Sequence, residues 1–308
     1  MPLTYPPTQP TLTGDVLTIN RFLNAPKQVA RRLRDLSDQA FISDVLLTGR
    51  VQASGGAIAY EQAEPIYTDR APSSVAPGAE YERALAPGGT ALLAKVTKYG
   101  QDVKLTDEAI GRMGTTSVDR VLQKIVNRTV SFVDTITLAA IAAAVTQTQA
   151  AAAAWSNASA DPFLDLMLAQ AQIEDLTEGY SPDTVVVTST LYARLVANQK
   201  VISGLGREST NTITNTGDIT RIAGLVLRAV PSSRMPAGIT AMILDSTQLG
   251  SLGFEDIPSP EYTGDARTGI ESWVRRDPAA TDSYLIRGRR PVVPIVQEPG
   301  AAVKITGA

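Results

Sequence analysis

The chain has 308 residues, of which 44% are hydrophobic and 19% are charged, enough for one large globular domain or two ordinary ones. The formal net charge is −3, so no overall basic field indicates a nucleic-acid-binding protein. The chain contains no cysteine and no histidine, which excludes disulfides, cysteine-based zinc sites, Ser-His-Asp triads and Cys-His pairs.

The N-terminal region is predicted to be an arm. Four prolines exclude a helix at its start: Pro2, Pro6, Pro7 and Pro10. A short amphipathic helix follows, with Val29, Leu33 and Leu36 on one face. We interpret its arginines as a solvated face in preference to a nucleic-acid patch; they are Arg31, Arg32 and Arg34. The N-terminus does not resemble a secretory signal, and the alanine-rich stretch 138–155 is too polar for a membrane span. We therefore expect a chain made in the cytoplasm with no membrane partner.

Residues 48–98 are predicted to form a long β-hairpin. Two strand-like runs, 57–60 and 91–99, are separated by proline- and glycine-rich turns. Few large apolar residues lie between them, so the hairpin cannot bury a face of its own and should pack on something else, such as another subunit. Four tyrosines either contact that neighbour or hold the hairpin to its own chain, and the sequence leaves both open: Tyr60, Tyr67, Tyr81 and Tyr99.

A long helix is predicted after the hairpin. Thr106 suits an N-cap, because Asp107 and Glu108 follow it in the first turn. Apolar residues then recur at spacings of three and four over 116–149, which predicts one amphipathic helix of roughly 50 Å.

Beyond Asp161-Pro162 the pattern is that of an α/β region followed by β-structure. The expected helices are 163–176 and 191–198, and the expected strands are 184–188, 225–230, 240–245, 273–274, 284–287, 292–296 and 302–305, with a polar loop at 203–217. Pro291 and Pro294 favour an edge or irregular strand near the C-terminus.

No motif for catalysis or cofactor binding is present. The chain lacks a phosphate-binding loop, a Gly-x-Ser-x-Gly elbow and a Ser-x-x-Lys pair. Three acidic pairs are better explained as helix-start or surface residues than as catalytic carboxylates: Asp107-Glu108, Glu174-Asp175 and Glu255-Asp256. We predict no catalytic residue, no cofactor and no metal site.

The order of these elements resembles the major capsid proteins of tailed bacteriophages with the Hong-Kong-97-type fold. Local stretches carry the resemblance: Val96-Thr-Lys-Tyr-Gly with 103–108 for the hairpin-to-helix junction, 121–134 for the spine helix, 222–231, 233–238 and 241–245 for the axial domain, and 289–296 for the closing peripheral strand. The resemblance covers residues from about 45 to the C-terminus.

The resemblance implies an α+β fold with four parts. These are an N-terminal arm (1–47), an extended hairpin loop or E-loop (48–98), a peripheral domain with the spine helix (99–157 and 270–308), and an axial α/β domain (158–269). It also implies self-assembly into pentamers and hexamers of an icosahedral virion shell around double-stranded DNA, without sequence-specific contact. Other implied partners are a separate scaffolding protein, a portal and a cement protein. Salt bridges from Arg275, Arg276, Arg289 or Arg290 to a neighbouring subunit are a further hypothesis.

One departure from the family concerns covalent cross-linking. Some members join subunits through a Lys–Asn isopeptide bond, but residues 48–94 contain no lysine and no asparagine follows Asn215. We therefore expect a non-covalent shell. The alternatives are an encapsulin-like nanocompartment, a carboxylate-dependent hydrolase, and a tail or surface-array protein.

Overall fold

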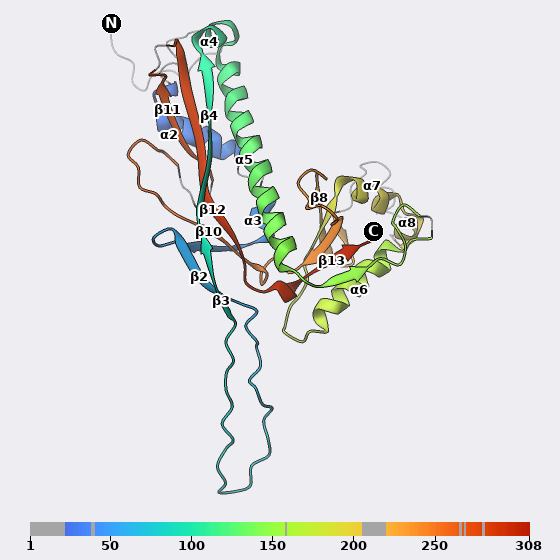
Figure 1. The fold of residues 1–308 in the computed structure, drawn as a ribbon. Coiled ribbons are helices and arrows are strands. Elements are labelled where there is room, and N and C mark those ends of the chain that lie inside the picture. The colour runs from blue at the N-terminus through green and yellow to red at the C-terminus, as the bar shows by residue number, and fades with distance from the viewer. Residues whose placement is uncertain are drawn as a thin grey trace, which may run out of the picture.

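The computed structural model describes residues 22–37, 41–157, 159–204, 220–264, 267, 269–278 and 281–308. The predicted extended segment 1–21 and most of the predicted polar loop 203–217 lie outside these residues. Figure 1 shows an elongated body along one long helix, a second body beside the end of that helix, and a hairpin that projects away from both.

The helices are α2 (Pro26–Ser37), α3 (Ser43–Leu46), α4 (Asp107–Met113), α5 (Thr115–Ala144), α6 (Pro162–Glu174), α7 (Ser189–Ala197), α8 (Gln199–Gly204) and the 3-10 turn η1 (Pro299–Ala301). The strands are β1 (Gly49–Gln52), β2 (Ala57–Gln62), β3 (Thr90–Lys95), β4 (Thr97–Thr106), β5 (Thr148–Ala150), β6 (Thr184–Thr188), β7 (Arg221–Ile222), β8 (Leu225–Val230), β9 (Ala241–Leu244), β10 (Gly250–Phe254), β11 (Glu271–Arg276), β12 (Ser283–Val296) and β13 (Ala302–Thr306).

Strand β12 is the centre of a five-stranded sheet. It pairs with β4 on one side, and with β11 and then β10 on the other; β1 adds to β10. The prediction of an edge or irregular strand here was wrong for β12 as a whole. Each proline nevertheless lies where one flank has no partner: Pro291 falls between the last β11 pair and the first β10 pair, and Pro294 lies beyond the end of β4.

Helix α5 packs across this sheet and begins as predicted. The Thr106 side chain accepts a hydrogen bond from the Ala109 amide, which confirms the N-cap of α4. Gly114 has a φ of 58° and joins α4 to α5. The helix ends at Ala144 and not at 149, because 148–150 form strand β5, which pairs in parallel with β13.

The second body contains a six-stranded sheet in the order β5-β13-β9-β6-β8-β7. Strands β6 and β8 have the predicted bounds, and all five residues of β6 are buried. Some strands pair in a different sheet from the one that the expected domain boundaries assign to them. Strand β13, from 270–308, pairs in the six-stranded sheet, whereas β10, from 158–269, pairs in the five-stranded sheet.

Helix α2 is docked on the first body. Leu23, Val29 and Leu33 are buried in the same core cluster as Leu122 of α5. Among the described helices, α5 is the one long and apolar enough to cross a membrane by length and composition. The apolar side of α5 packs against the five-stranded sheet and against α2, as expected of a core helix.

The close approach of α5 to β12 depends on Gly288. A Cβ at this position would lie 2.5 Å from Cγ2 of Ile125 and 3.1 Å from Cγ2 of Ile270. We predict that Gly288→Ala lowers the free energy of unfolding by about 1–3 kcal/mol, measured by urea denaturation of the full chain. Gly111→Ala is the matched control, since nothing lies near its Cβ and alanine favours the α4 helix. The Gly288→Ala/Ile125→Ala double variant should lose less than the sum of the single losses; strict additivity would contradict the contact.

Candidate assembly surfaces

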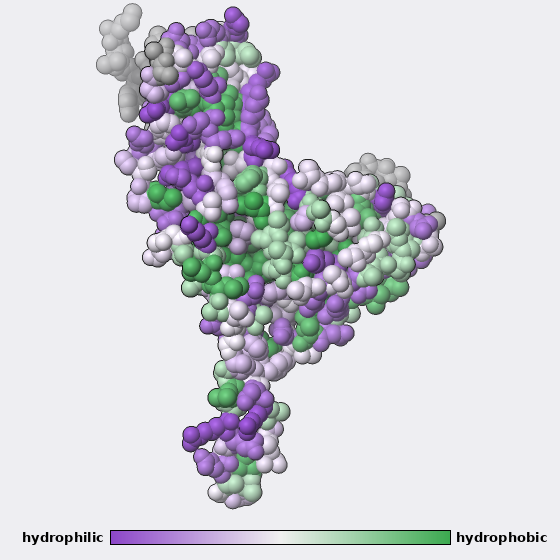
Figure 2. Space-filling view, in the orientation of Figure 1, coloured by the Kyte–Doolittle hydropathy of each residue, from purple (hydrophilic) through white to green (hydrophobic). Residues whose placement is uncertain are grey.

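The hairpin is the most exposed part of the described chain. Strands β2 and β3 pair from Ala57↔Lys95 to Gln62↔Thr90, and the segment between them projects without a partner strand. Large apolar side chains on it are uncovered, with exposed fractions of 58% for Ile66, 78% for Tyr81 and 73% for Leu85. Figure 2 shows apolar and hydrophilic side chains mixed along this projection. The hairpin therefore presents apolar surface that none of the described residues buries.

The root of the hairpin is held to the body. Ile58 packs with Ala53 and Ile295 in a small separate core. The Ala63 amide donates to the Gln297 carbonyl at 2.9 Å, and Nε2 of Gln62 donates to the Val296 carbonyl at 2.9 Å. The projecting segment thus starts from a fixed base.

The four tyrosines divide between the two roles left open by the sequence. Tyr67 donates its hydroxyl to the Thr177 carbonyl at 2.7 Å, and Tyr99 packs edge-on against Phe132 with ring centroids 5.0 Å apart. Tyr60 is half-buried at the root. Tyr81 has most of its surface exposed and is the tyrosine best placed to contact another molecule.

A hollow of about 450 Å³ lies beside the hairpin root, where Glu64, Tyr67 and Glu298 are among the lining residues. Burial raises the pKa of Glu298, and the charges of Glu178 and Glu64 raise it further, while a hydrogen bond from Tyr180 opposes the shift. The Tyr180 hydroxyl stays protonated, since burial and the acids Glu178 and Glu298 raise its pKa. The hairpin therefore leaves the body next to a crowded set of carboxylates.

A second fixed point lies between the two sheets, at Asp134 of α5. This side chain has no exposed surface; it accepts the Ser43 amide at 3.0 Å and a guanidinium hydrogen from Arg234 at 2.9 Å. Ser43 belongs to α3 and Arg234 to the turn after β8, so one carboxylate joins three segments far apart in sequence. Burial raises the pKa of Asp134 despite the hydrogen bonds and the Arg234 charge. Sequence reasoning missed this residue, because an aspartate in a helix gives no sign that it is buried.

The arginine hypothesis is wrong for two of its four residues. Arg289 pairs with buried Glu271, and Arg290 pairs with Asp44 at 2.9 Å beneath the ring of Phe41. Both side chains are almost fully buried in their own chain, so neither reaches a neighbour. Arg276 is partly exposed and pairs with Asp107. Arg275 is exposed and lies over Trp273 at 4.7 Å, so it remains a candidate for intermolecular contact.

The three acidic pairs lie on separate elements: at the start of α4, at the end of α6 and after β10. Asp107 starts α4 and holds Arg276, and Glu174 ends α6, where it accepts a hydrogen bond from Gln170. Asp256 is exposed after β10. Within the described residues, no group of three or more acidic side chains is arranged to hold a metal ion.

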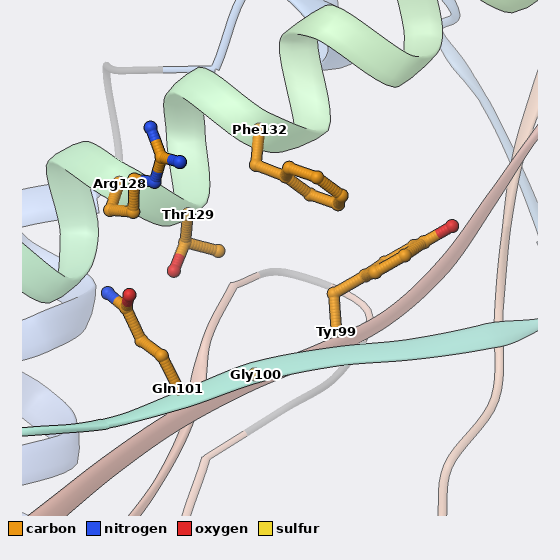
Figure 3. Close-up of a pocket in the computed structure, with 6 residues that line it drawn as sticks. All are labelled: Tyr99, Gly100, Gln101, Arg128, Thr129 and Phe132. Carbon is orange, nitrogen blue, oxygen red and sulfur yellow. The ribbon is translucent and has the colours of Figure 1, made fainter.

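A hollow of about 180 Å³ lies between α5 and the edge strand β4. Figure 3 shows Phe132 and Tyr99 facing each other across the gap, with Thr129 and Gln101 facing each other beside them. Arg128 lies at its rim on the exposed side of α5. The described residues that line this hollow include no carboxylate.

One family model and several solved structures are similar to this chain. The family model described as phage capsid protein matches residues 89–305. The capsid structure of the cyanophage P-SCSP1u is similar, with 16% identity, a TM-score of 0.59, and coverage of 87% of this chain and 88% of that one. Also similar is the mature capsid of bacteriophage PhiM1, with 10% identity, a TM-score of 0.57, and coverage of 86% of this chain and 86% of that one. A virus-like particle from Pyrococcus furiosus has 10% identity and a TM-score of 0.56, with coverage of 91% of this chain and 99% of that one. No curated protein matches by sequence. The likenesses confirm the expected α+β phage-capsid fold.

The raised pKa of Asp134 predicts a definite pH dependence. The folded chain binds a proton at Asp134 more readily than the unfolded chain does, so its contribution to stability falls as the pH rises from about 3.8 through the raised value. Asparagine does not titrate. The free energy of unfolding of the parent chain, minus that of Asp134→Asn, should therefore decrease over this range, measured by urea denaturation at successive pH values. Arg234→Gln is the control: it should move the decrease to higher pH, and an unchanged difference across the range would contradict the assignment.

Proposed function

The chain belongs to the phage capsid protein family, and we propose that it is the major capsid subunit of a tailed phage that assembles into an icosahedral shell around the genome. The observation that carries the proposal is the hairpin, whose apolar side chains project from a fixed root and are not covered by the part of the chain that the structure describes. In a closed symmetric shell, such surfaces are buried on neighbouring copies.

We propose a division of the chain that follows its two sheets. The five-stranded sheet with α5 forms the peripheral domain, and the six-stranded sheet forms the axial domain. Strand β10 then belongs to the peripheral domain, and β5 and β13 belong to the axial domain. The hairpin between β2 and β3 is the E-loop, and residues 1–47 form the arm.

The partners follow from the same role. The subunit associates with itself in pentamers and hexamers, with a separately encoded scaffolding protein, a portal and a cement protein, and with double-stranded DNA that it does not read by sequence. Assembly takes place in the host cytoplasm, and the product is the virion shell. We propose no enzymatic activity, in keeping with a family of structural proteins.

An encapsulin-like nanocompartment is the second candidate, favoured by the likeness to the Pyrococcus furiosus virus-like particle. The contents of purified particles separate the two: nucleic acid after expression in the phage's host supports the capsid, and a single co-purifying enzyme supports the nanocompartment. Electron microscopy of the full chain, with and without its scaffold, tests both. A dispersed monomer under every condition would reject both.

Removal of the hairpin tip should separate folding from assembly. We predict that replacing residues 65–86 by a short glycine linker changes the free energy of unfolding by only about 1 kcal/mol. Among the described contacts, one hydrogen bond joins this segment to the rest of the chain, and the segment buries little surface. The same variant should form no closed shells in electron micrographs. Tyr67→Phe is the matched control, since it removes only the bond to Thr177 and should still assemble. Normal shells without residues 65–86 would contradict the proposed role of the hairpin.

The shell should be non-covalent. Since no lysine lies in 48–94 and no asparagine follows Asn215, this subunit from assembled particles boiled in detergent should run as one band at 32.6 kDa. A ladder of higher-mass bands that survives boiling would show cross-linking and contradict this prediction.

A further inference from the structure

One charged surface is not explained by folding or by the hairpin. The solvent side of α5 carries Arg120, Lys124 and Arg128 at successive intervals of four residues, and all three are exposed. Four residues advance a helix by about 6 Å, so the three cations form a line of about 12 Å along a rigid rod. Figure 2 shows hydrophilic side chains along the margin of the upper body, where α5 runs in Figure 1.

These cations have no counter-charge in the described chain. No described carboxylate forms an ion pair with Arg120, Lys124 or Arg128, and the printed side-chain contact of Arg120 is with the sulfur of Met113 at 3.7 Å. The two acids of α5 are engaged elsewhere: Asp119 pairs with Arg32, and Asp134 is buried. Like charges four residues apart destabilise a helix, so the three cations do not stabilise α5.

Helix α2 extends the same surface. It packs on α5 through Val29 and Leu33, and the 3.2 Å pair between Arg32 and Asp119 joins the exposed sides of the two helices. Lys27 and Arg31 are two further exposed cations of α2. The chain as a whole carries a net charge of −3, so this positive region is a local concentration and not a general property.

We propose that the exposed faces of α2 and α5 contact the phosphate backbone of packaged double-stranded DNA, so that this side of the subunit faces the interior of the shell. The inference rests on the proposed capsid function. Over 12 Å, duplex DNA presents about seven phosphate charges, enough to match the cations without any reading of bases.

The character of the surface favours DNA over an acidic protein. Protein partners need an apolar centre to the interface. Between Thr116 and Ser131 the exposed residues of α5 are polar or charged, with Gln123 and Asn127 beside the cations, and the first exposed large apolar side chain is Phe132. A polar, positive surface suits binding that is electrostatic and independent of sequence.

The experiment measures binding of the full-length, unassembled subunit to two duplexes of unrelated sequence by fluorescence anisotropy over a series of salt concentrations. The test variant is Arg120→Gln/Lys124→Gln/Arg128→Gln. The control is Arg194→Gln/Arg221→Gln/Arg228→Gln, which removes the same charge from exposed positions on the second body. We expect the parent chain to bind both duplexes alike. The slope of log K against log salt should shrink by about 2.7 in the test variant, at about 0.9 per lost phosphate contact, and stay near the parent value in the control.

Four results would overturn the proposal: no binding by the parent chain at low salt, an unchanged slope in the test variant, an equal loss in the control, or binding of polyglutamate without binding of DNA. If the triple variant misfolds, Lys124→Gln alone should shrink the slope by about 0.9.

Closed parent shells should lose binding to added duplex, since the surface then lies inside. Closed shells that bind added duplex as tightly as free subunits do would reject the interior placement. Shell formation is scored separately by electron microscopy, so subunits that close into shells but bind no DNA reject only this inference.

Discussion

The ladder between β4 and β12 is the constraint on which the other parts of the molecule depend. It runs without interruption from Thr97↔Val292 to Thr106↔Ser283. At one end, β3 stops at Lys95, so the returning strand of the hairpin is a direct continuation of the ladder. At the other end, Thr106 caps α4, which turns through Gly114 into α5. One strand pairing therefore sets both the direction in which the hairpin leaves the body and the point at which the long helix begins.

The two bodies are joined by more than one chain crossing. Helix α5 leads into β5, β12 leads through η1 into β13, and β5 and β13 then pair with each other in the second sheet. Asp134 adds a polar contact at the same junction, since it holds Ser43 beside the first sheet and Arg234 beside the second. Because this carboxylate is fully buried, neither partner can be lost without leaving polar groups unpaired away from water. The angle between the bodies is thereby specified by covalent and polar contacts together.

The parts of the fold that the sequence predicts correctly are those governed by local rules. The Thr106 cap, the buried strand β6 and the strand β8 each follow from a few neighbouring residues. The errors arise where distant pairing decides. Residues 148–150 continue a helical pattern, yet they form a strand because β13 offers an edge. Strand β12 accommodates two prolines because its partners begin and end beside them.

Charged residues were harder to interpret from the sequence than apolar ones. Arg289 and Arg290 have the composition of a surface cluster, yet a buried glutamate and a half-buried aspartate neutralise them inside the body. Asp134 likewise looks like an ordinary helix residue until its partners arrive from other segments. In each instance the sign of the charge is evident from the sequence, but its environment depends on long-range packing.

The basic surface on α2 and α5 also depends on long-range packing, which here leaves charges exposed instead of burying them. Each helix alone carries too few cations to stand out in a chain that is slightly acidic as a whole. Leu33 is buried in the core shared with α5, whereas Arg31 and Arg32 of α2 are exposed and Arg32 pairs with Asp119 of α5. The apolar residues of α2 and α5 pack against each other and against the sheet. The residues left facing solvent are therefore mainly polar, and their charges add. The segregation of charge is thus a consequence of how the hydrophobic core is built, and it appears only when two segments nearly ninety residues apart are brought together, as the separation of 87 residues between Arg32 and Asp119 shows.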